Sequence, residues 1–236
     1  MTREEFIEAL TRKRAALIDM DGVLYDSMPR HARAWRKTML ELGIDCPEEE
    51  FFLYEGMTGP ATINLLMQRE KGESLSDGEC KEIYAVKAEL FRRQGDVEVM
   101  SGAQRMITAL GLGGLRRVLV TGSAQSTLLN RLDTDYPGAF PGDMRVTALD
   151  VVHGKPDPEP YLRGLEKAGV GADEAIVIEN APLGVRAGKR AGVLTVAVTT
   201  GPIAREEFEK EGADIIFSSM PEFAGAVEEA FLKTKD

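Results

Sequence analysis

Cysteine, histidine and tryptophan are scarce in this sequence of 236 residues. The two cysteines, Cys46 and Cys80, form no CxxC pair and have no histidine nearby at metal-ligand spacing. Neither a disulfide framework nor a zinc site is therefore indicated, and two histidines in the whole chain argue against a histidine metal cluster. This usage of cysteine fits a reducing compartment, and we expect a cytoplasmic protein.

Long apolar runs and a positive net charge are also missing. No hydrophobic stretch approaches the ~20 residues that a membrane-spanning helix needs, and the N-terminal MTREEFIEALTRKR has no apolar signal-peptide core. Asp and Glu number 39 against 29 Lys and Arg, which gives a net charge of −10. Because this charge repels a phosphate backbone, we expect binding to neither nucleic acid nor membranes.

The sequence does contain a series of short apolar runs that are typical of buried strands. The first run, AALID, begins at Ala15, and the later ones are Val118–Val120, Val146–Leu149, Ala175–Ile178, Val193–Val198 and Ile215–Phe217. Segments of helical character separate the later runs, so the pattern predicts an α/β fold with a parallel sheet between two layers of helices. Such sheets bind ligands at the carboxyl ends of their strands.

Residues 27–101 interrupt this alternation. They contain no convincing strand, and their apolar residues recur at helical spacing, as in Ala32, Trp35 and Met39. We therefore predict two domains: a catalytic core formed by residues 1–26 and 102–236, and a helical cap formed by residues 27–101. The cap leaves the sheet after the first strand, so it can close over the strand ends.

Acidic residues follow the first predicted strand in the motif DMDGVLYDS. Asp19 and Asp21 lie two residues apart, and two carboxylates so close repel each other unless a cation neutralises them. Oxygen-rich sites of this kind suit Mg²⁺. Taken alone, the pair is equally compatible with a polar turn.

Two further motifs offer groups that bind phosphate oxygens. The second strand ends in VLVTGS, where Thr121 supplies a hydroxyl and Gly122 and Ser123 supply backbone N–H groups ahead of a helix. The alternative is an ordinary helix cap, for which Ser and Thr are favoured. In HGKPDPEPY, Lys155 lies in a loop stiffened by prolines, and the alternative is a solvated surface lysine.

A fourth motif, IVIENAPLGVRAG, ends a strand with Glu179 and Asn180, two oxygen ligands that could equally form a polar turn. The four motifs occur in order, each at or after a strand end of one predicted sheet. Together they supply carboxylates for a nucleophile and an acid/base, a hydroxyl and a lysine for phosphoryl oxygens, and further oxygens for a metal. Phosphoryl transfer needs these groups.

Through DMDGVLYDS, TGS, GKPDPEPY and IENAPLGVRAG, the chain resembles the haloacid dehalogenase superfamily over nearly its whole length. The position of the helical insert resembles the β-phosphoglucomutase-like branch, whose core is a Rossmann-like sheet under a helical cap. The combination of YEGMTG, VTGS, FPGDM, GKPDPEPYL and VIENAPLGV is similar to bacterial inorganic pyrophosphatases of that branch. The resemblance implies a Mg²⁺-dependent phosphohydrolase that acts on pyrophosphate, and we expect a monomer.

The resemblance also implies a role for each motif residue. Asp19 attacks phosphorus and becomes an aspartyl phosphate, while Asp21 protonates the leaving oxygen and then activates water. The residues implied to hold the transferring phosphoryl group are Thr121, Gly122, Ser123 and Lys155. Those implied to surround Mg²⁺ are Asp19, Asp21 through its backbone carbonyl, Glu179 and Asn180. In the cap, His31 and Lys87 are implied to face the substrate, although both could be solvated helix residues.

Two departures from the branch bear on the substrate. Most members have a second carboxylate where this chain has Asn180, and Glu55 in the cap loop YEGMTGP is a candidate to compensate as a metal ligand, unless it only caps or solvates a helix. Hexose-phosphate mutases carry an arginine where this chain has Gly59. Both departures favour pyrophosphate. The alternatives are a β-phosphoglucomutase, a sugar-phosphate phosphatase and a non-catalytic phosphate-binding module.

Overall fold

A parallel β-sheet forms the centre of the computed structural model, which describes residues 1–123 and 126–232. Its strands lie in the order β3-β2-β1-β4-β5-β6 and pair in parallel throughout. They are β1 (Ala15–Ile18), β2 (Arg116–Val120), β3 (Arg145–Val146), β4 (Ala175–Glu179), β5 (Leu194–Val198) and β6 (Ile215–Phe217). The predicted α/β fold is confirmed.

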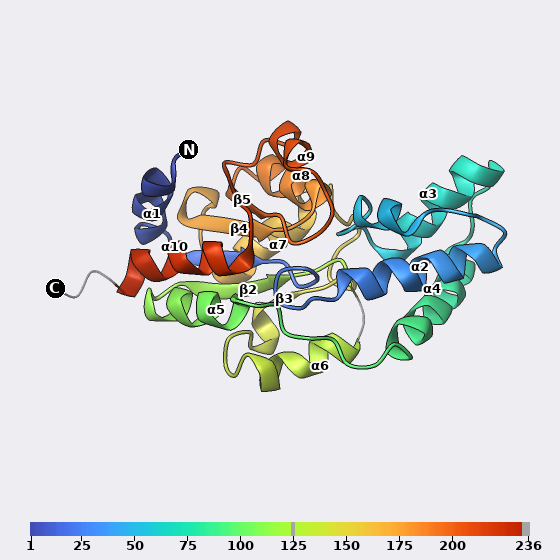
Figure 1. Cartoon of the computed structure of the whole chain (residues 1–236), viewed down its shortest axis with the longest axis horizontal. Coiled ribbons are helices and arrows are strands. Elements are labelled where there is room, and N and C mark those ends of the chain that lie inside the picture. The colour runs from blue at the N-terminus through green and yellow to red at the C-terminus, as the bar shows by residue number, and fades with distance from the viewer. Residues whose placement is uncertain (124–125, 233–236) are drawn as a thin grey trace.

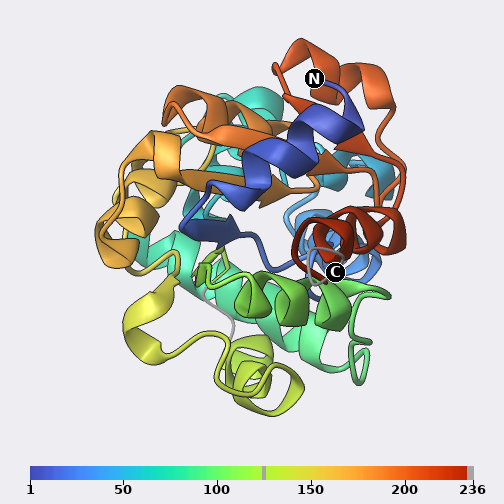
Figure 2. The same cartoon turned by 90° about the vertical axis from the view of Figure 1, so that its left-hand side faces the viewer.

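Helices cover both faces of the sheet because successive strand residues point to opposite sides. Ile18 of β1 packs into one apolar cluster and Leu17 into the other. The first face carries α1 (Arg3–Thr11), α5 (Ala103–Leu112), α6 (Ser126–Asp135) and α10 (Met220–Leu232), and the second carries α7 (Glu159–Ala168) and α8 (Pro182–Arg190) (Figures 1 and 2). The short α9 (Arg205–Lys210) packs against α8 and β5 through Phe208. None of the helices in the described ranges has the length and apolar composition of a membrane span.

The third strand is shorter than its apolar run predicts. The run Val146–Leu149 suggests a strand throughout, but β3 ends at Val146. Asp150 Oδ2 accepts hydrogen bonds from both the backbone N and Oγ1 of Thr147, each at 2.8 Å, and so draws the chain into a turn. Leu149 consequently points into solvent and is 85% exposed.

Between β1 and α5 the chain forms the helices α2 (Met28–Glu41), α3 (Gly59–Lys71) and α4 (Asp77–Arg92), with the 3₁₀ turn η1 (Glu48–Phe52) among them. They enclose an apolar cluster of their own and lie at the end of the molecule opposite both termini (Figure 1). We call residues 27–101 the cap. The chain enters and leaves it side by side, because Tyr25 bridges Val99 in antiparallel fashion and Met100 N donates to Leu24 O at 2.9 Å.

Candidate active site

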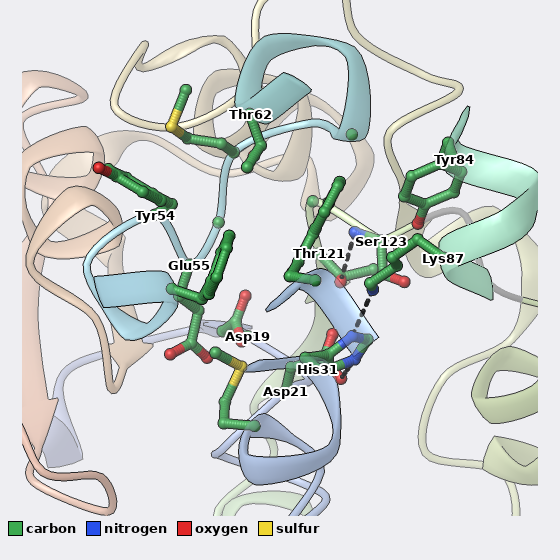
Figure 3. Close-up of a pocket in the computed structure, with 17 residues that line it drawn as sticks. Asp19, Asp21, His31, Tyr54, Glu55, Thr62, Tyr84, Lys87, Thr121 and Ser123 are labelled. Atoms are coloured by element: carbon green, nitrogen blue, oxygen red, sulfur yellow. Dashed lines mark hydrogen bonds and ion pairs between the residues drawn. The ribbon is translucent and has the colours of Figure 1, made fainter. Parts of the chain in front are cut away.

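The predicted site residues of the core meet at the carboxyl edge of the sheet, beneath the cap. Asp19 follows β1 directly, and its backbone N donates to Ile178 O at 3.0 Å. Thr121 follows β2 and is fixed in the same way, by a 2.9 Å bond from its N to Val146 O. A cavity of about 60 Å³ lies between these strand ends and the cap, and Asp19, Asp21 and the loop from Thr121 to Ser123 form its floor (Figure 3).

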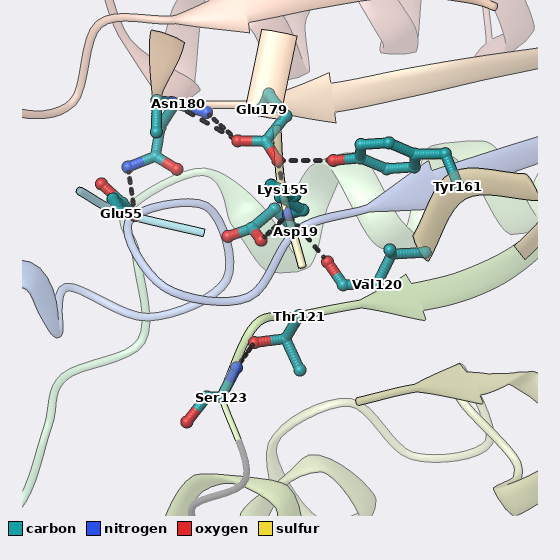
Figure 4. A network of polar contacts seen from close by, with 10 residues as sticks. Asp19, Glu55, Val120, Thr121, Ser123, Lys155, Tyr161, Glu179 and Asn180 are labelled. Atoms are coloured by element: carbon teal, nitrogen blue, oxygen red, sulfur yellow. Dashed lines mark hydrogen bonds and ion pairs between the residues drawn. The ribbon is translucent and has the colours of Figure 1, made fainter. Parts of the chain in front are cut away.

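Lys155 is buried at the centre of the site and not solvated, since only 2% of it is exposed. Its Nζ donates to Asp19 Oδ1, to Glu179 Oε1 at 2.5 Å and to Val120 O at 3.1 Å (Figure 4). Burial disfavours the charged amine, but Asp19 and Glu179 outweigh it and raise the pKa of Lys155 above its usual value. Lys155 therefore stays a cation.

Asp21 belongs to a second chain of contacts that reaches into the cap. Its Oδ1 accepts hydrogen bonds from Ser27 Oγ at 2.6 Å and His31 Nε2 at 2.9 Å. Lys87 Nζ lies 2.6 Å from His31 Nδ1 (Figure 3). Burial, together with Lys87, lowers the pKa of His31, so the ring is neutral, donates from Nε2 and accepts at Nδ1. Burial also lowers the pKa of Lys87 to about 7. Burial opposes ionisation of Asp21 as well, but His31 and Ser27 outweigh it and lower its pKa.

The residues at the strand ends fit a Mg²⁺ ion. Burial raises the pKa of Asp19 to about 8 against the effect of Lys155, and burial with the charge of Asp19 raises the pKa of Glu55. Several buried carboxyl groups in one place repel each other when ionised, and a bound cation would stabilise their ionised forms. Within the described structure, Asp19 Oδ2 and Asn180 Oδ1 are buried acceptors without a hydrogen-bond partner. No three Asp, Glu, His or Cys side chains of the described residues gather as ligands, so the ion would need the Asn180 amide and backbone oxygen in its shell.

Glu55 reaches from the cap to the core and neither caps nor solvates a helix. It is buried, and its Oε1 accepts a 2.9 Å hydrogen bond from Asn180 Nδ2 (Figure 4). The loop that carries it rests on the core through glycines. A Cβ on Gly122 would lie 2.4 Å from Gly56 O, and one on Gly56 would lie 2.8 Å from Lys155 Cδ. The cap loop therefore covers the stem of the central lysine.

Several contacting residues were not expected from the sequence. Ser27 and Tyr161 bond to Asp21 and Glu179, and they stand at the ends of the motifs DMDGVLYDS and GKPDPEPY, where each could have been noticed. Lys87 lies 5.1 Å from the ring centroid of Trp35 and 5.6 Å from that of Tyr84, so cation–π contacts accompany its bond to His31. The contact with Tyr84 lies within α4, where the two residues are three positions apart. The contacts with Trp35 and His31 join α4 to α2, and no pattern in the sequence predicts them.

Comparisons with known proteins agree with this geometry. A family model for haloacid dehalogenase-like hydrolases matches residues 13–192, and the chain belongs to this family. Hexitol phosphatase A of Escherichia coli K12 is 29% identical over 187 residues, which cover 79% of this chain and 83% of the relative. 2-Deoxyglucose-6-phosphate phosphatase 1 of Saccharomyces cerevisiae is 27% identical over 220 residues, which cover 86% of this chain and 87% of the relative.

A solved structure of a candidate β-phosphoglucomutase from Bacteroides vulgatus superposes with a TM-score of 0.90. It is 43% identical and covers 98% of this chain, which in turn covers 99% of that structure. The predicted superfamily and its β-phosphoglucomutase-like relatives are confirmed. None of these three proteins is named for pyrophosphate, so the expected likeness to inorganic pyrophosphatases has no support from them.

Proposed function

We propose that the protein is a Mg²⁺-dependent phosphatase that transfers a phosphoryl group first to Asp19 and then to water. The observation that carries the proposal is that the two oxygens of the Asp19 carboxylate have different surroundings. Asp19 lines the cavity; its Oδ1 is held by Lys155, whereas its Oδ2 is buried and has no hydrogen-bond partner. One oxygen is thus fixed and the other is left for an incoming phosphorus atom or a metal.

Each neighbouring group has a part in this reaction. Asp19 forms the new bond to phosphorus, and the Thr121 hydroxyl binds an oxygen of the transferring group, while Lys155 holds Asp19 and supplies positive charge beside it. Asp21 gives a proton to the leaving oxygen and later takes one from the attacking water. The lowered pKa of Asp21 suits its role as the base, and an anionic substrate nearby raises that pKa toward the value an acid needs. Mg²⁺, held by Asp19, Asn180 and the backbone of Asp21, would supply positive charge for the phosphoryl oxygens.

The first substrate class that we propose is a phosphorylated sugar or sugar alcohol. The names of the relatives support this class. The rings of Trp35, Tyr54 and Tyr84 also line the cavity and offer apolar faces on which a carbohydrate ring could pack.

A second candidate, inorganic pyrophosphate, is favoured by the contact between Glu55 and Asn180. This contact brings a cap carboxylate to the place where the core lacks one. Gly59 has no side chain that could bind a distant phosphate. The Tyr84 ring also leaves no space for one, since a Cβ on Gly59 would lie 2.2 Å from it. A small substrate that brings its own oxygens to the metal needs no such grip.

Phosphate release, measured with and without Mg²⁺, tests the function and separates the two substrate classes. The panel is pyrophosphate, β-glucose 1-phosphate, a hexitol phosphate and 2-deoxyglucose 6-phosphate. We expect Asp19→Asn to lose several orders of magnitude in turnover, as a lost nucleophile does. If that variant retains more than about a tenth of the wild-type rate, which corresponds to only about 1.4 kcal/mol, covalent catalysis through Asp19 is wrong.

Glu55→Ala separates the candidates further. If pyrophosphate is the substrate, its hydrolysis should fall by about 10–100-fold, as when support for a metal site is removed, with little change in thermal stability. If the wild type prefers a sugar phosphate by an order of magnitude in kcat/KM, the second candidate is wrong and the first stands. If Glu55→Ala cleaves pyrophosphate normally, the proposed support of the metal site by Glu55 is wrong.

A further inference from the structure

Tyr161 lies behind the site, away from the cavity. It belongs to the first turn of α7, is fully buried, and packs with side chains of β1, β2 and β4. Its hydroxyl donates to Glu179 Oε1 at 2.5 Å (Figure 4). A phenylalanine would fill the same apolar space, so the hydroxyl is explained by this one contact.

The carboxylate of Glu179 has no acceptor position left for another partner. Its Oε1 accepts from Lys155 and Tyr161, and its Oε2 accepts from the backbone N of Asn180 at 3.1 Å and of Ala181 at 3.4 Å. A carboxylate offers about four acceptor positions, and these four bonds use them. The backbone of α8 closes the remaining side, since a Cβ on Gly184 would lie 2.0 Å from Oε1.

Glu179 also does not line the cavity, whereas Asp19 and Asp21 do. What it touches is Lys155, whose three ammonium donors are used on Glu179, Asp19 and Val120 O. The position of the ammonium group therefore depends on Glu179, and the position of Glu179 depends on the hydroxyl of Tyr161. The Tyr161 ring supports the same ammonium group, with its centroid 5.1 Å from Nζ.

We propose that Tyr161 is a positioning residue for phosphoryl transfer: its hydroxyl orients Glu179 so that Lys155 holds Asp19 Oδ1 and leaves Oδ2 without a protein partner. Glu179 then acts through Lys155, not by direct contact with the metal, which differs from the ligand set that the family resemblance implies. The inference rests on the proposed role of Asp19 as the nucleophile.

Tyr161→Phe tests the proposal, because it removes the hydroxyl and keeps the ring. We expect kcat to fall by about 10–100-fold, the range for partners that orient a catalytic group. KM should change by less than about threefold, since the groups that bind substrate remain. Wild type and Asp19→Asn are assayed first, so that failure of the proposed function is recognised separately.

Mg²⁺ binding without substrate gives a readout independent of turnover. In calorimetric titrations with Mg²⁺ alone, Tyr161→Phe should keep the wild-type Kd within about threefold, whereas Asn180→Ala, which removes the unpartnered Oδ1, should raise it by about 10–100-fold. If Tyr161→Phe weakens Mg²⁺ as much as Asn180→Ala does, Glu179 supports the metal directly and the proposal is overturned.

Tyr136→Phe is the matched control. The Tyr136 hydroxyl is also buried and donates to Leu24 O at 2.5 Å, outside the site. Both variants lose one buried hydrogen bond, so a general loss of stability should affect them alike. We expect Tyr136→Phe to keep the wild-type kcat. An equal fall of kcat in both variants, or no fall in Tyr161→Phe, would refute the positioning role.

Discussion

At the scale of single residues, the site is dominated by an excess of buried carboxyl groups. Asp19, Asp21, Glu55 and Glu179 are all buried, and Lys155 is the cation in direct contact with two of them. Because the pKa values of Asp19 and Glu55 are raised, the metal-free cluster holds at least one proton near neutral pH. A metal ion has to displace that proton in order to bind.

We therefore predict that Mg²⁺ affinity increases as the pH rises from 6 to 8 and that binding releases protons. The sign follows from the raised pKa values: below about pH 8 the Asp19 carboxyl is protonated and competes with the metal, and above it the competition ends. Calorimetry in two buffers of different ionisation enthalpy measures the protons released. The Glu55→Gln variant should release fewer protons than the wild type when Mg²⁺ binds, because it lacks one of the carboxyl groups with a raised pKa. Affinity independent of pH, with no proton released, would contradict the prediction.

At the scale of elements, the sequence predicts best what depends on burial alone. The runs at β1 and β4 are apolar without interruption because both strands lie inside the sheet. The end of β3 was predicted wrongly because a side-chain turn between Thr147 and Asp150, and not hydrophobicity, decides it. That Glu55 of the cap loop reaches the core near Asn180 was only a hypothesis from the sequence. The two residues are 125 positions apart, and they meet only because of how the whole cap is placed on the core.

The glycine contacts beneath the cap loop lead to a prediction at this scale. A Cβ on Gly154 would lie 2.8 Å from Thr58 Cγ2 and 3.0 Å from Thr58 N. Gly154→Ala should hold the cap loop away from the core and lower kcat/KM by about 10–100-fold, because such overpacking costs about 1–3 kcal/mol. Adding Thr58→Ser removes Cγ2, the closest of these atoms, and should restore part of the lost kcat/KM, since the contact with the backbone N remains.

The control for this pair is Gly142→Ala, because a Cβ at Gly142 meets no atom within 4 Å. The measurement is kcat/KM on one substrate for Gly154→Ala, for the double variant with Thr58→Ser, and for Gly142→Ala. Full activity of Gly154→Ala, or no recovery in the double variant, would show that the cap loop does not need this close approach.

At the scale of the whole molecule, the four motifs were sufficient to predict the superfamily and the phosphatase class, because they supply the chemistry that the family shares. The substrate depends instead on the surface that the cap presents. Trp35, Tyr84 and Lys87 meet there from two helices, and their contacts follow from how those helices pack. Local motifs do not encode that packing, so they predict the chemistry of the site but not its substrate.

The placement of Trp35 has a practical consequence. It is the only tryptophan in the chain and lines the cavity, with an ammonium group 5.1 Å from its ring. Intrinsic fluorescence excited at the indole band therefore reports on one point of the molecule, the wall that an arriving ligand meets. We predict a saturable change in emission when the inactive Asp19→Asn variant is titrated with its substrate, and none with a non-phosphorylated sugar. The protein thus carries its own optical probe, and binding can be followed without a label and without turnover.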